Sequence, residues 1–228
     1  MDPVVGEAPV WLLLAAGAAG AVTGWFLPGL VLRHSPAGGA APSRPVLTAA
    51  TAGLFLLVAA VLGLSWQLPA HLFLVVVAVV LTVIDLRHHL LPNAVVLPAL
   101  AVGLVLLAVA AIGDGTWGAL LRAVLGAMAL FGLYLVLALI SPAGLGMGDV
   151  KLAAVLGLFL AYQGWGALLV GALLMSVIGA VVGLAVLALG RGGRRSDVPF
   201  GPSMLAGALV GVLWGDRFAR ELLLPGLY

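Results

Sequence analysis

The chain contains no cysteine and very little charge. Its 228 residues include ten Lys or Arg and eight Asp or Glu, together 8% of the sequence. Without cysteine, the chain can form neither a disulfide framework nor a cysteine-ligated zinc site, and it has no thiol nucleophile. The scarcity of charge excludes an ordinary soluble domain, because such domains are about one quarter charged. A water-soluble surface of this size needs more polar groups than the sequence supplies.

Long apolar runs account for the remaining composition, since 64% of the residues are hydrophobic. A helix that crosses a bilayer needs about 20 mostly apolar residues. Between charges and Pro/Gly breaks, the sequence predicts an all-α polytopic membrane protein with about eight transmembrane helices, or seven if one short run fails to span. The expected helices cover residues 9–32, 46–65, 70–86, 94–112, 117–140, 150–163, 165–189 and 200–215.

The basic residues predict the orientation of these helices. If the N-terminus lies outside, the cytoplasmic segments hold Arg33, Arg44, Arg87, Lys151, Arg191, Arg194 and Arg195, and the outer segments hold Arg122, Arg217 and Arg220. This distribution agrees with the positive-inside rule. Residues 34–45 then form a short cytoplasmic loop. The basic residues are separated by apolar runs and form no continuous patch, so the sequence excludes a nucleic-acid partner.

Two aspartates stand where expected helices meet the cytoplasmic boundary. Asp85 ends the run LFLVVVAVVLTVID, and Asp149 precedes the sixth run. An ionisable residue at that depth predicts a functional site, because burying it costs several kcal/mol unless it is paired. Asp197 is different, since it lies beside Arg194 and Arg195 in a basic loop, where a solvated ion pair is expected.

A pair of close carboxylates shares one proton, because like charges about 3 Å apart cannot both ionise cheaply. The ionised carboxylate can take a proton from water while the protonated one polarises a carbonyl. Such a dyad requires neither a metal nor a cofactor. The same aspartates could also serve a small proton- or cation-coupled transporter, and this is the alternative function.

The second aspartate lies in GLGMGDVK (144–151), behind a run of glycines. Gly146 and Gly148 lack a Cβ, so the backbone there can be approached closely by another segment or by an extended peptide. On its own, the tetrapeptide GMGD is equally consistent with a helix-breaking turn that ends in an N-capping aspartate, Asp149. Lys151 either extends to the lipid headgroups or lowers the pKa of Asp149.

Three segments in this order resemble the type IV prepilin leader peptidase family, a family of membrane aspartic peptidases of the G-x-G-D type. The segments are VIDLRHHLLPN (83–93), GLGMGDVKLAAVLGLFL (144–160) and PFGPSMLAGALVG (199–211), within a resemblance that extends over about residues 45–215. The resemblance implies that Asp85 and Asp149 are the catalytic residues. It also implies that Gly146, Gly148 and Lys151 support the second motif.

The resemblance implies one integral-membrane peptidase domain over residues 1–228, in the inner membrane with its active site facing the cytoplasm. Its substrates would be type IV prepilin or pseudopilin precursors, from which a short leader is removed. Long members also methylate the new N-terminus with S-adenosylmethionine and carry two C-x-x-C pairs in the first loop. This sequence has no cysteine there, and the N-terminal motif is reduced to Gly20, Gly24 and Arg33. These differences count against methyl transfer, and S-adenosylmethionine would be needed only if that activity is retained.

Overall fold

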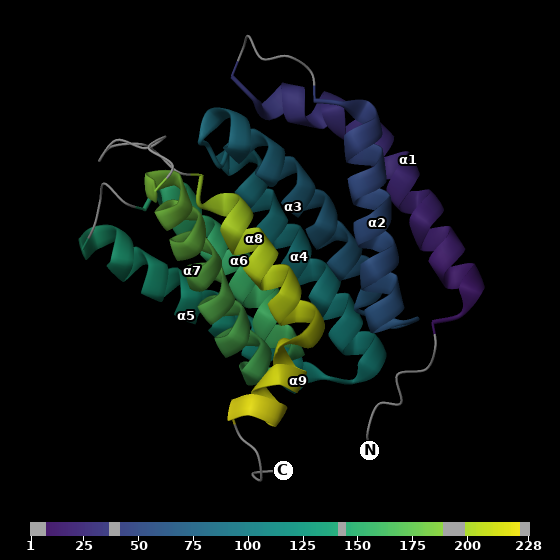
Figure 1. Ribbon diagram of the computed structural model, residues 1–228. Coiled ribbons are helices and arrows are strands. Elements are labelled where there is room, and N and C mark those ends of the chain that lie inside the picture. The colour runs from purple at the N-terminus through teal and green to yellow at the C-terminus, as the bar shows by residue number, and fades with distance from the viewer. Residues whose placement is uncertain (1–7, 37–41, 141–144, 189–198, 224–228) are drawn as a thin grey trace.

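The computed structural model describes residues 8–36, 42–140, 145–188 and 199–223 (Figure 1). Within these ranges the chain is helical and contains no strand. The helices are α1 (Val10–His34), α2 (Arg44–Leu62), α3 (Leu68–His88), α4 (Asn93–Asp114), α5 (Trp117–Ile140), α6 (Met147–Gln163), α7 (Trp165–Ala188) and α8 (Gly201–Val210). Beyond α8 the chain stays helical through π-helical turns at Gly211–Gly215 and Ala219–Leu223 and through the short α9 (Asp216–Phe218).

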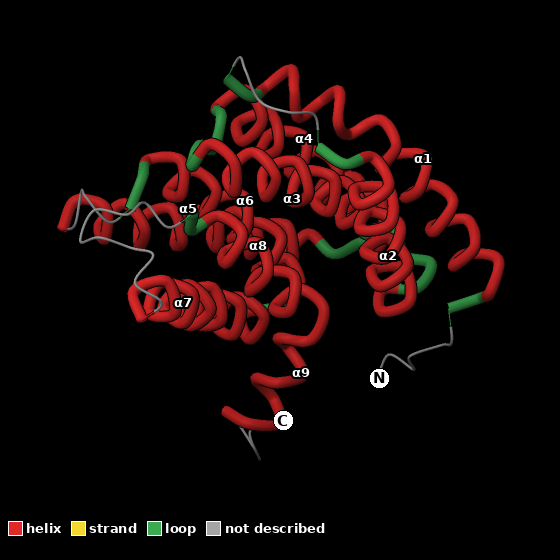
Figure 2. The backbone as a smooth tube through the Cα atoms, turned by 45° about the horizontal axis from the view of Figure 1, so that its top comes forward, coloured by secondary structure: helices red, strands yellow, loops and turns green. Residues whose placement is uncertain are grey.

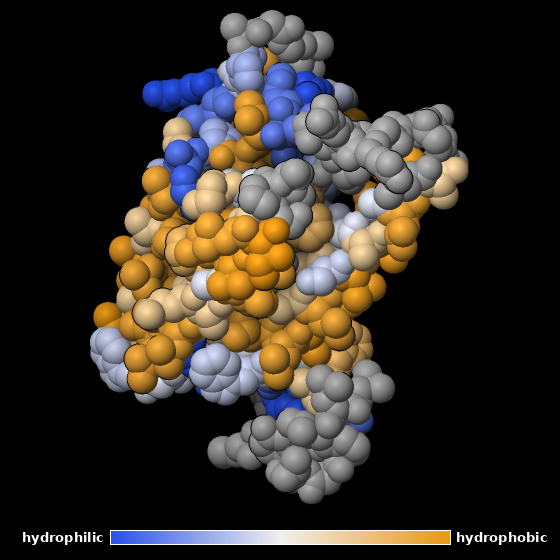
Figure 3. All heavy atoms as spheres, turned by 90° about the vertical axis from the view of Figure 1, so that its left-hand side faces the viewer, coloured by the Kyte–Doolittle hydropathy of each residue, from blue (hydrophilic) through white to orange (hydrophobic). Residues whose placement is uncertain are grey.

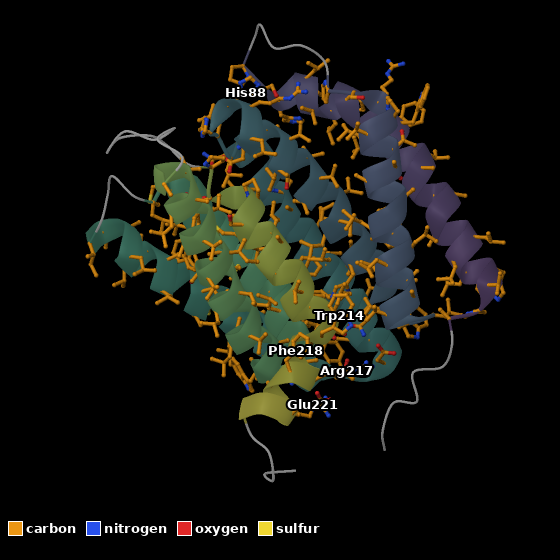
Figure 4. The ribbon with its side chains drawn as sticks, in the orientation of Figure 1. His88, Trp214, Arg217, Phe218 and Glu221 are labelled. Carbon is orange, nitrogen blue, oxygen red and sulfur yellow. The ribbon has the colours of Figure 1, made fainter. Side chains whose placement is uncertain are left out.

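Consecutive helices run in opposite directions, so their ends gather at two ends of one bundle (Figure 1). Figure 4 labels His88 at one end, and Trp214, Arg217, Phe218 and Glu221 at the other. We call the first the His88 end and the second the Arg217 end. The His88 end contains the last residues of α3, α5 and α7 and the first residues of α4, α6 and α8.

The structure confirms an all-α membrane protein. Six of the described helices, α1 to α5 and α7, are long and apolar enough to cross a membrane. The third run, expected over 70–86, extends to 21 residues because the helix continues to His88. By contrast, α6 has 17 residues and α8 has ten. An apolar belt separates hydrophilic residues at the two ends of the molecule (Figure 3), as expected for side chains that face lipid between two aqueous surfaces.

Helix α6 lies in the interior, in contact with α4, α5, α7 and α8 (Figure 2). From Val150 to Tyr162 every residue except Lys151 is buried, which is the expected environment for a helix that is apolar on all sides. Helix α5 packs tightly against it. A Cβ on Gly157 would lie 2.5 Å from the carbonyl oxygen of Gly126, so this approach requires glycine.

Side chains also hold the C-terminus of α6 at the Arg217 end. The Arg122 guanidinium on α5 donates to the carbonyl oxygens of Ala161 and Tyr162, at 2.6 and 2.7 Å. These carbonyls belong to the last turn of α6, where no intrahelical donor remains for them. Gln163 then donates to the Gln67 side chain at the start of α3 (2.9 Å). The position of α6 along its axis is therefore fixed, and with it the position of Asp149 at the opposite end.

Candidate active site

Asp85 lies in the last turn of α3 at the His88 end, with 5% of its surface exposed. Its Oδ2 accepts a hydrogen bond from the backbone N–H of Gly201, the first residue of α8, at 2.9 Å. A Cβ on Gly201 would lie 2.7 Å from that oxygen, so the residue must be glycine for the carboxylate to approach. Helix N-termini carry partial positive charge, which stabilises a carboxylate there.

Asp149 lies in the first turn of α6 and is half-buried. Its Oδ2 accepts a hydrogen bond from the backbone N–H of Gly146, the N-cap residue, at 3.0 Å. The carboxylate thus occupies the position from which an acidic side chain reaches back to the start of its own helix. GMGD therefore forms the turn that starts α6, but the N-cap residue is Gly146 and not Asp149, which is the third residue of the helix. This turn does not compete with a functional interpretation.

The structure separates the roles of the two motif glycines. A Cβ on Gly148 would lie 2.9 Å from the Cβ of Leu91, so close approach requires glycine at this position. A Cβ on Gly146 would meet only ordinary contacts, and its contribution in the structure is the N–H donated to Asp149. Leu91 also lies near Gly201, since a Cβ there would be 3.3 Å from the Leu91 side chain. This leucine therefore packs between the segments that hold the two aspartates.

Asp85 and Asp149 lie at the same end of the bundle, in segments that both approach Leu91. The pKa of Asp149 is raised from its ordinary value of 3.8 to about 6, mainly because the carboxyl is buried. The hydrogen bond from Gly146 opposes this rise, and the negative charge of Asp85 adds to it. Asp149 lies outside the six helices that are long enough to cross a membrane. Its raised pKa makes it a carboxyl group that retains a proton well above the usual range.

Lys151 does not pair with Asp149. Its Nζ donates instead to the side-chain oxygen of Asn93 at 2.9 Å, and both groups are exposed. Asn93 is the first residue of α4, after the N-cap Pro92, as the sequence predicts for this Pro-Asn pair. The lysine thus links the G-x-G-D segment to the end of the segment VIDLRHHLLPN (83–93). This contact is neither the extension to lipid headgroups nor the effect on Asp149 that the sequence suggested for Lys151.

Two of the functional contacts could not be read from the residues that make them. The N–H of Gly201 binds the Asp85 carboxylate, but in the sequence Gly201 is one glycine among 32. The contact between Gly148 and Leu91 joins two of the motifs, but no residue type marks it. Asp197, Arg194 and Arg195 lie outside the described residues.

An apolar cavity of about 390 Å³ lies between α2, α3 and α8, and its lining on α3 ends at Val83, two residues before Asp85, which does not itself line it. Thr82 and Val83 line one end, just before Asp85, together with Pro202, which follows Gly201. His71 and Val212 line the other end, toward the Arg217 end. Eleven residues separate Thr82 from His71 in the sequence, and at about 1.5 Å per helical residue this corresponds to about 16 Å.

The residues named for methyl transfer do not fit a cofactor site. A Cβ on Gly20 would lie 2.8 Å from the Cα of Ala52, and one on Gly24 would lie 2.7 Å from the Cα of Thr48. Both glycines are therefore used in the packing of α1 on α2, and that packed face is not available to contact S-adenosylmethionine. Arg33 is exposed in the last turn of α1. Among the described residues, no three His, Cys, Asp or Glu side chains gather closely enough to hold a metal ion.

Comparison with known proteins gives a consistent result. A sequence model of the type IV leader peptidase family matches residues 72–184. A protein of Stutzerimonas stutzeri named prepilin leader peptidase/N-methyltransferase is 38% identical over 165 residues, which cover 71% of this chain and 55% of that protein. Proteins of the same name from Pseudomonas aeruginosa and Bacillus subtilis are 35% and 32% identical, over 78% and 75% of this chain and 61% and 66% of their own lengths. The chain thus spans between about half and two thirds of the length of these relatives, and no solved structure matches it significantly.

Proposed function

Because the chain belongs to the type IV leader peptidase family, we propose that it is a membrane aspartic endopeptidase that removes the short leader from type IV prepilin or pseudopilin precursors. Asp85 and Asp149 are the catalytic residues in this proposal. The observation that supports it most directly is that the segments holding these two residues, 64 positions apart in the sequence, meet around Leu91 at one end of the bundle.

The reaction follows from a carboxylate pair that shares one proton. The ionised carboxylate takes a proton from a water molecule, whose oxygen attacks the scissile carbonyl carbon, while the protonated carboxyl donates a hydrogen bond to the carbonyl oxygen. The tetrahedral intermediate collapses, the C–N bond breaks, and the leaving amine takes a proton from the dyad. Because one shared proton is required, activity falls at alkaline pH once the pair loses it. The peptidase reaction uses no cofactor.

The apolar cavity beside Asp85 supports the assignment of the substrate class. A prepilin-like precursor carries an apolar helical segment directly after its cleavage site, so that segment needs an apolar surface that starts at the catalytic aspartates. The cavity begins at Thr82, Val83 and Pro202, next to Asp85 and Gly201, and continues along α3 and α8. The leader itself is basic and leaves the bundle at the polar His88 end.

In the proposed orientation, the chain lies in the inner membrane and its His88 end faces the cytoplasm. Arg33, Arg44 and Lys151 lie in helix ends at the His88 end, whereas Arg122 and Arg217 lie toward the opposite end. Basic residues concentrate on the cytoplasmic side of membrane proteins. The same arrangement disfavours a transporter, because both aspartates lie at one end of the helices and neither lies at mid-depth.

Leader removal from a co-expressed prepilin, followed by the change in electrophoretic mobility, tests the proposal. Asp85→Asn and Asp149→Asn should each abolish cleavage without reducing the amount of protein in the membrane, because an amide can neither take nor supply the shared proton. Asp197→Asn is the matched control and should process the precursor normally. Full cleavage by either dyad variant, or loss of cleavage in the control, would contradict the assignment of Asp85 and Asp149.

A further inference from the structure

Tyr134 on α5 is a buried tyrosine whose hydroxyl group makes no hydrogen bond within the described residues. Only 2% of its surface is exposed, and its phenolic oxygen has no partner with acceptable geometry. Buried tyrosines normally direct their hydroxyl group to a hydrogen-bond partner, because an unpaired buried donor is unfavourable. A buried donor without a partner therefore suggests a partner that arrives with the reaction.

The packing of α5 on α6 places Tyr134 opposite Asp149. Two contacts fix the position of α5 along the axis of the antiparallel α6. Arg122 on α5 binds the Ala161 carbonyl, and Gly126 on α5 contacts Gly157 on α6. Tyr134 follows Gly126 by eight residues, and Asp149 precedes Gly157 by eight residues. Eight residues advance about 12 Å along each helix, so the two side chains reach the same level of the bundle at the His88 end.

The electrostatics agree with this register, because the Asp149 charge acts on the Tyr134 phenol. Of these two groups, the Ser176 hydroxyl on α7 acts more strongly on the phenol than the Asp149 charge does, but Ser176 and Tyr134 do not meet hydrogen-bond geometry in the structure. Ser176 Oγ donates instead to the carbonyl oxygen of Ala172 at 3.0 Å. Asp149 is thus the acidic group near this donor.

The titratable groups that face Asp149 are few. Asp85 faces it from α3 and Tyr134 from α5. On its own helix, Lys151 binds Asn93, the uncharged first residue of α4. Helices α7 and α8 contain no Asp, Glu, His, Lys, Arg or Tyr. His89, the C-cap residue of α3, acts on Asp85 in turn. A change in how Asp149 titrates can therefore be attributed to Asp85 with its neighbour His89, or to Tyr134.

We propose that Tyr134 is a positioning residue of the active site, whose hydroxyl group donates a hydrogen bond to the ionised Asp149 carboxylate in the substrate complex. This inference rests on the proposed peptidase function. No such bond is present in the structure, which agrees with the general observation that catalytic hydrogen bonds often tighten only when substrate is bound. The bond would orient Asp149 toward the water molecule and stabilise its ionised form.

The test is the pH dependence of kcat for Tyr134→Phe, measured with purified protein in detergent micelles and a prepilin-like precursor. Phenylalanine keeps the ring and its packing and removes only the hydroxyl group. Because Asp149 is ionised in the reactive complex, its protonation limits kcat on the acid side. A hydrogen bond to the charged form lowers a carboxyl pKa, so its loss should move the acidic limb of kcat to higher pH by about one unit. KM should stay within about twofold, because the binding surface for the apolar segment is unchanged.

Tyr162→Phe is the matched control. Tyr162 is also buried, but it lies at the far end of α6, where its hydroxyl group is 3.4 Å from that of Thr116. This variant should keep the wild-type pH profile. Ser176→Ala should keep it too, because the Ser176 hydroxyl is not part of the proposed contact.

Each other outcome overturns the inference. A wild-type profile for Tyr134→Phe means that its hydroxyl group does not act on Asp149. A lower kcat with an unshifted acidic limb means that the hydroxyl contacts the substrate instead, and the same shift in Ser176→Ala means that Tyr134 acts through α7. If the wild-type protein fails to cleave any precursor, the proposed function itself fails, and this result differs from a failure of the Tyr134 variant alone.

Discussion

Asp149 should lower the stability of the folded protein at neutral pH, and its replacement by asparagine should raise it. Burial holds the pKa of this carboxyl at about 6 in the folded state, against an ordinary value of 3.8. A raised pKa means that the folded state favours the protonated form. Well below pH 3.8 the carboxyl is protonated in both the folded and the unfolded state, and it does not change the stability. Above pH 6 it is ionised in both states, and the folded state bears the cost of burying the charge.

The magnitude follows from the size of this shift. A difference of about two pKa units, at about 1.4 kcal/mol per unit, corresponds to about 3 kcal/mol of lost stability at pH 8. This value is an upper bound, because Asp149 is only half-buried and water screens part of its charge. Asparagine is uncharged at every pH, and its side-chain oxygen can still accept the hydrogen bond from Gly146. Asp149→Asn should therefore gain about 1 to 3 kcal/mol at pH 8.

Thermal unfolding in detergent micelles, followed by circular dichroism between pH 4 and pH 8, measures this gain. We expect a Tm several degrees above that of the wild type at pH 8, and a difference that shrinks between pH 6 and pH 4 and is small at pH 4. Asp114→Asn is the matched control, because Asp114 is exposed at the end of α4. A gain of equal size at both pH values would refute the reasoning, since it would not arise from ionisation, and so would the absence of any gain at pH 8.

Two further predictions concern orientation and substrate binding. The chain has no cysteine, so Leu64→Cys and Leu90→Cys each introduce a unique thiol, at exposed positions just beyond α2 and α3. A membrane-impermeant maleimide should label Cys at position 64 in intact cells and Cys at position 90 only after the cells are opened. The reverse labelling pattern would contradict the proposed orientation. Ala206→Phe projects a ring into the apolar cavity and should raise KM for a prepilin-like precursor several-fold with kcat unchanged. The lipid-facing Ala101→Phe is its control, and equal KM values for both variants would remove the cavity from the substrate path.

The helices could be predicted from the sequence because each depends on local composition. Every expected apolar run forms a helix, and the predicted limits differ from the observed ones mainly at the termini. The last run was expected to end near residue 215, yet the chain stays helical to Leu223. This extension includes two π-helical turns. Such turns depend on packing against α7 rather than on residue type, so no sequence pattern predicts them.

The candidate site could be predicted only as far as single motifs extend. Asp85 and Asp149 stand out because charged residues are rare at the ends of apolar runs. Their hydrogen-bond partners carry no such mark. The contact between Asp85 and Gly201 joins residues 116 positions apart, and that between Lys151 and Asn93 joins residues 58 positions apart. Both depend on how α3, α4, α6 and α8 pack, and packing is a property of the whole bundle.

The position of Tyr134 beside the candidate site depends on helix packing that its sequence context does not reveal. In the sequence it is one aromatic residue within an apolar run, and burial in a helix interface explains it fully. Only the register between α5 and α6, fixed by Arg122 at one end and by the contact of Gly126 with Gly157, brings it to the level of Asp149. The glycines that allow this approach lie far from the aspartates, and a bulkier residue at either position would separate α5 from α6. The geometry around Asp149 is therefore set by small residues deep in the bundle as well as by the G-x-G-D motif at its end.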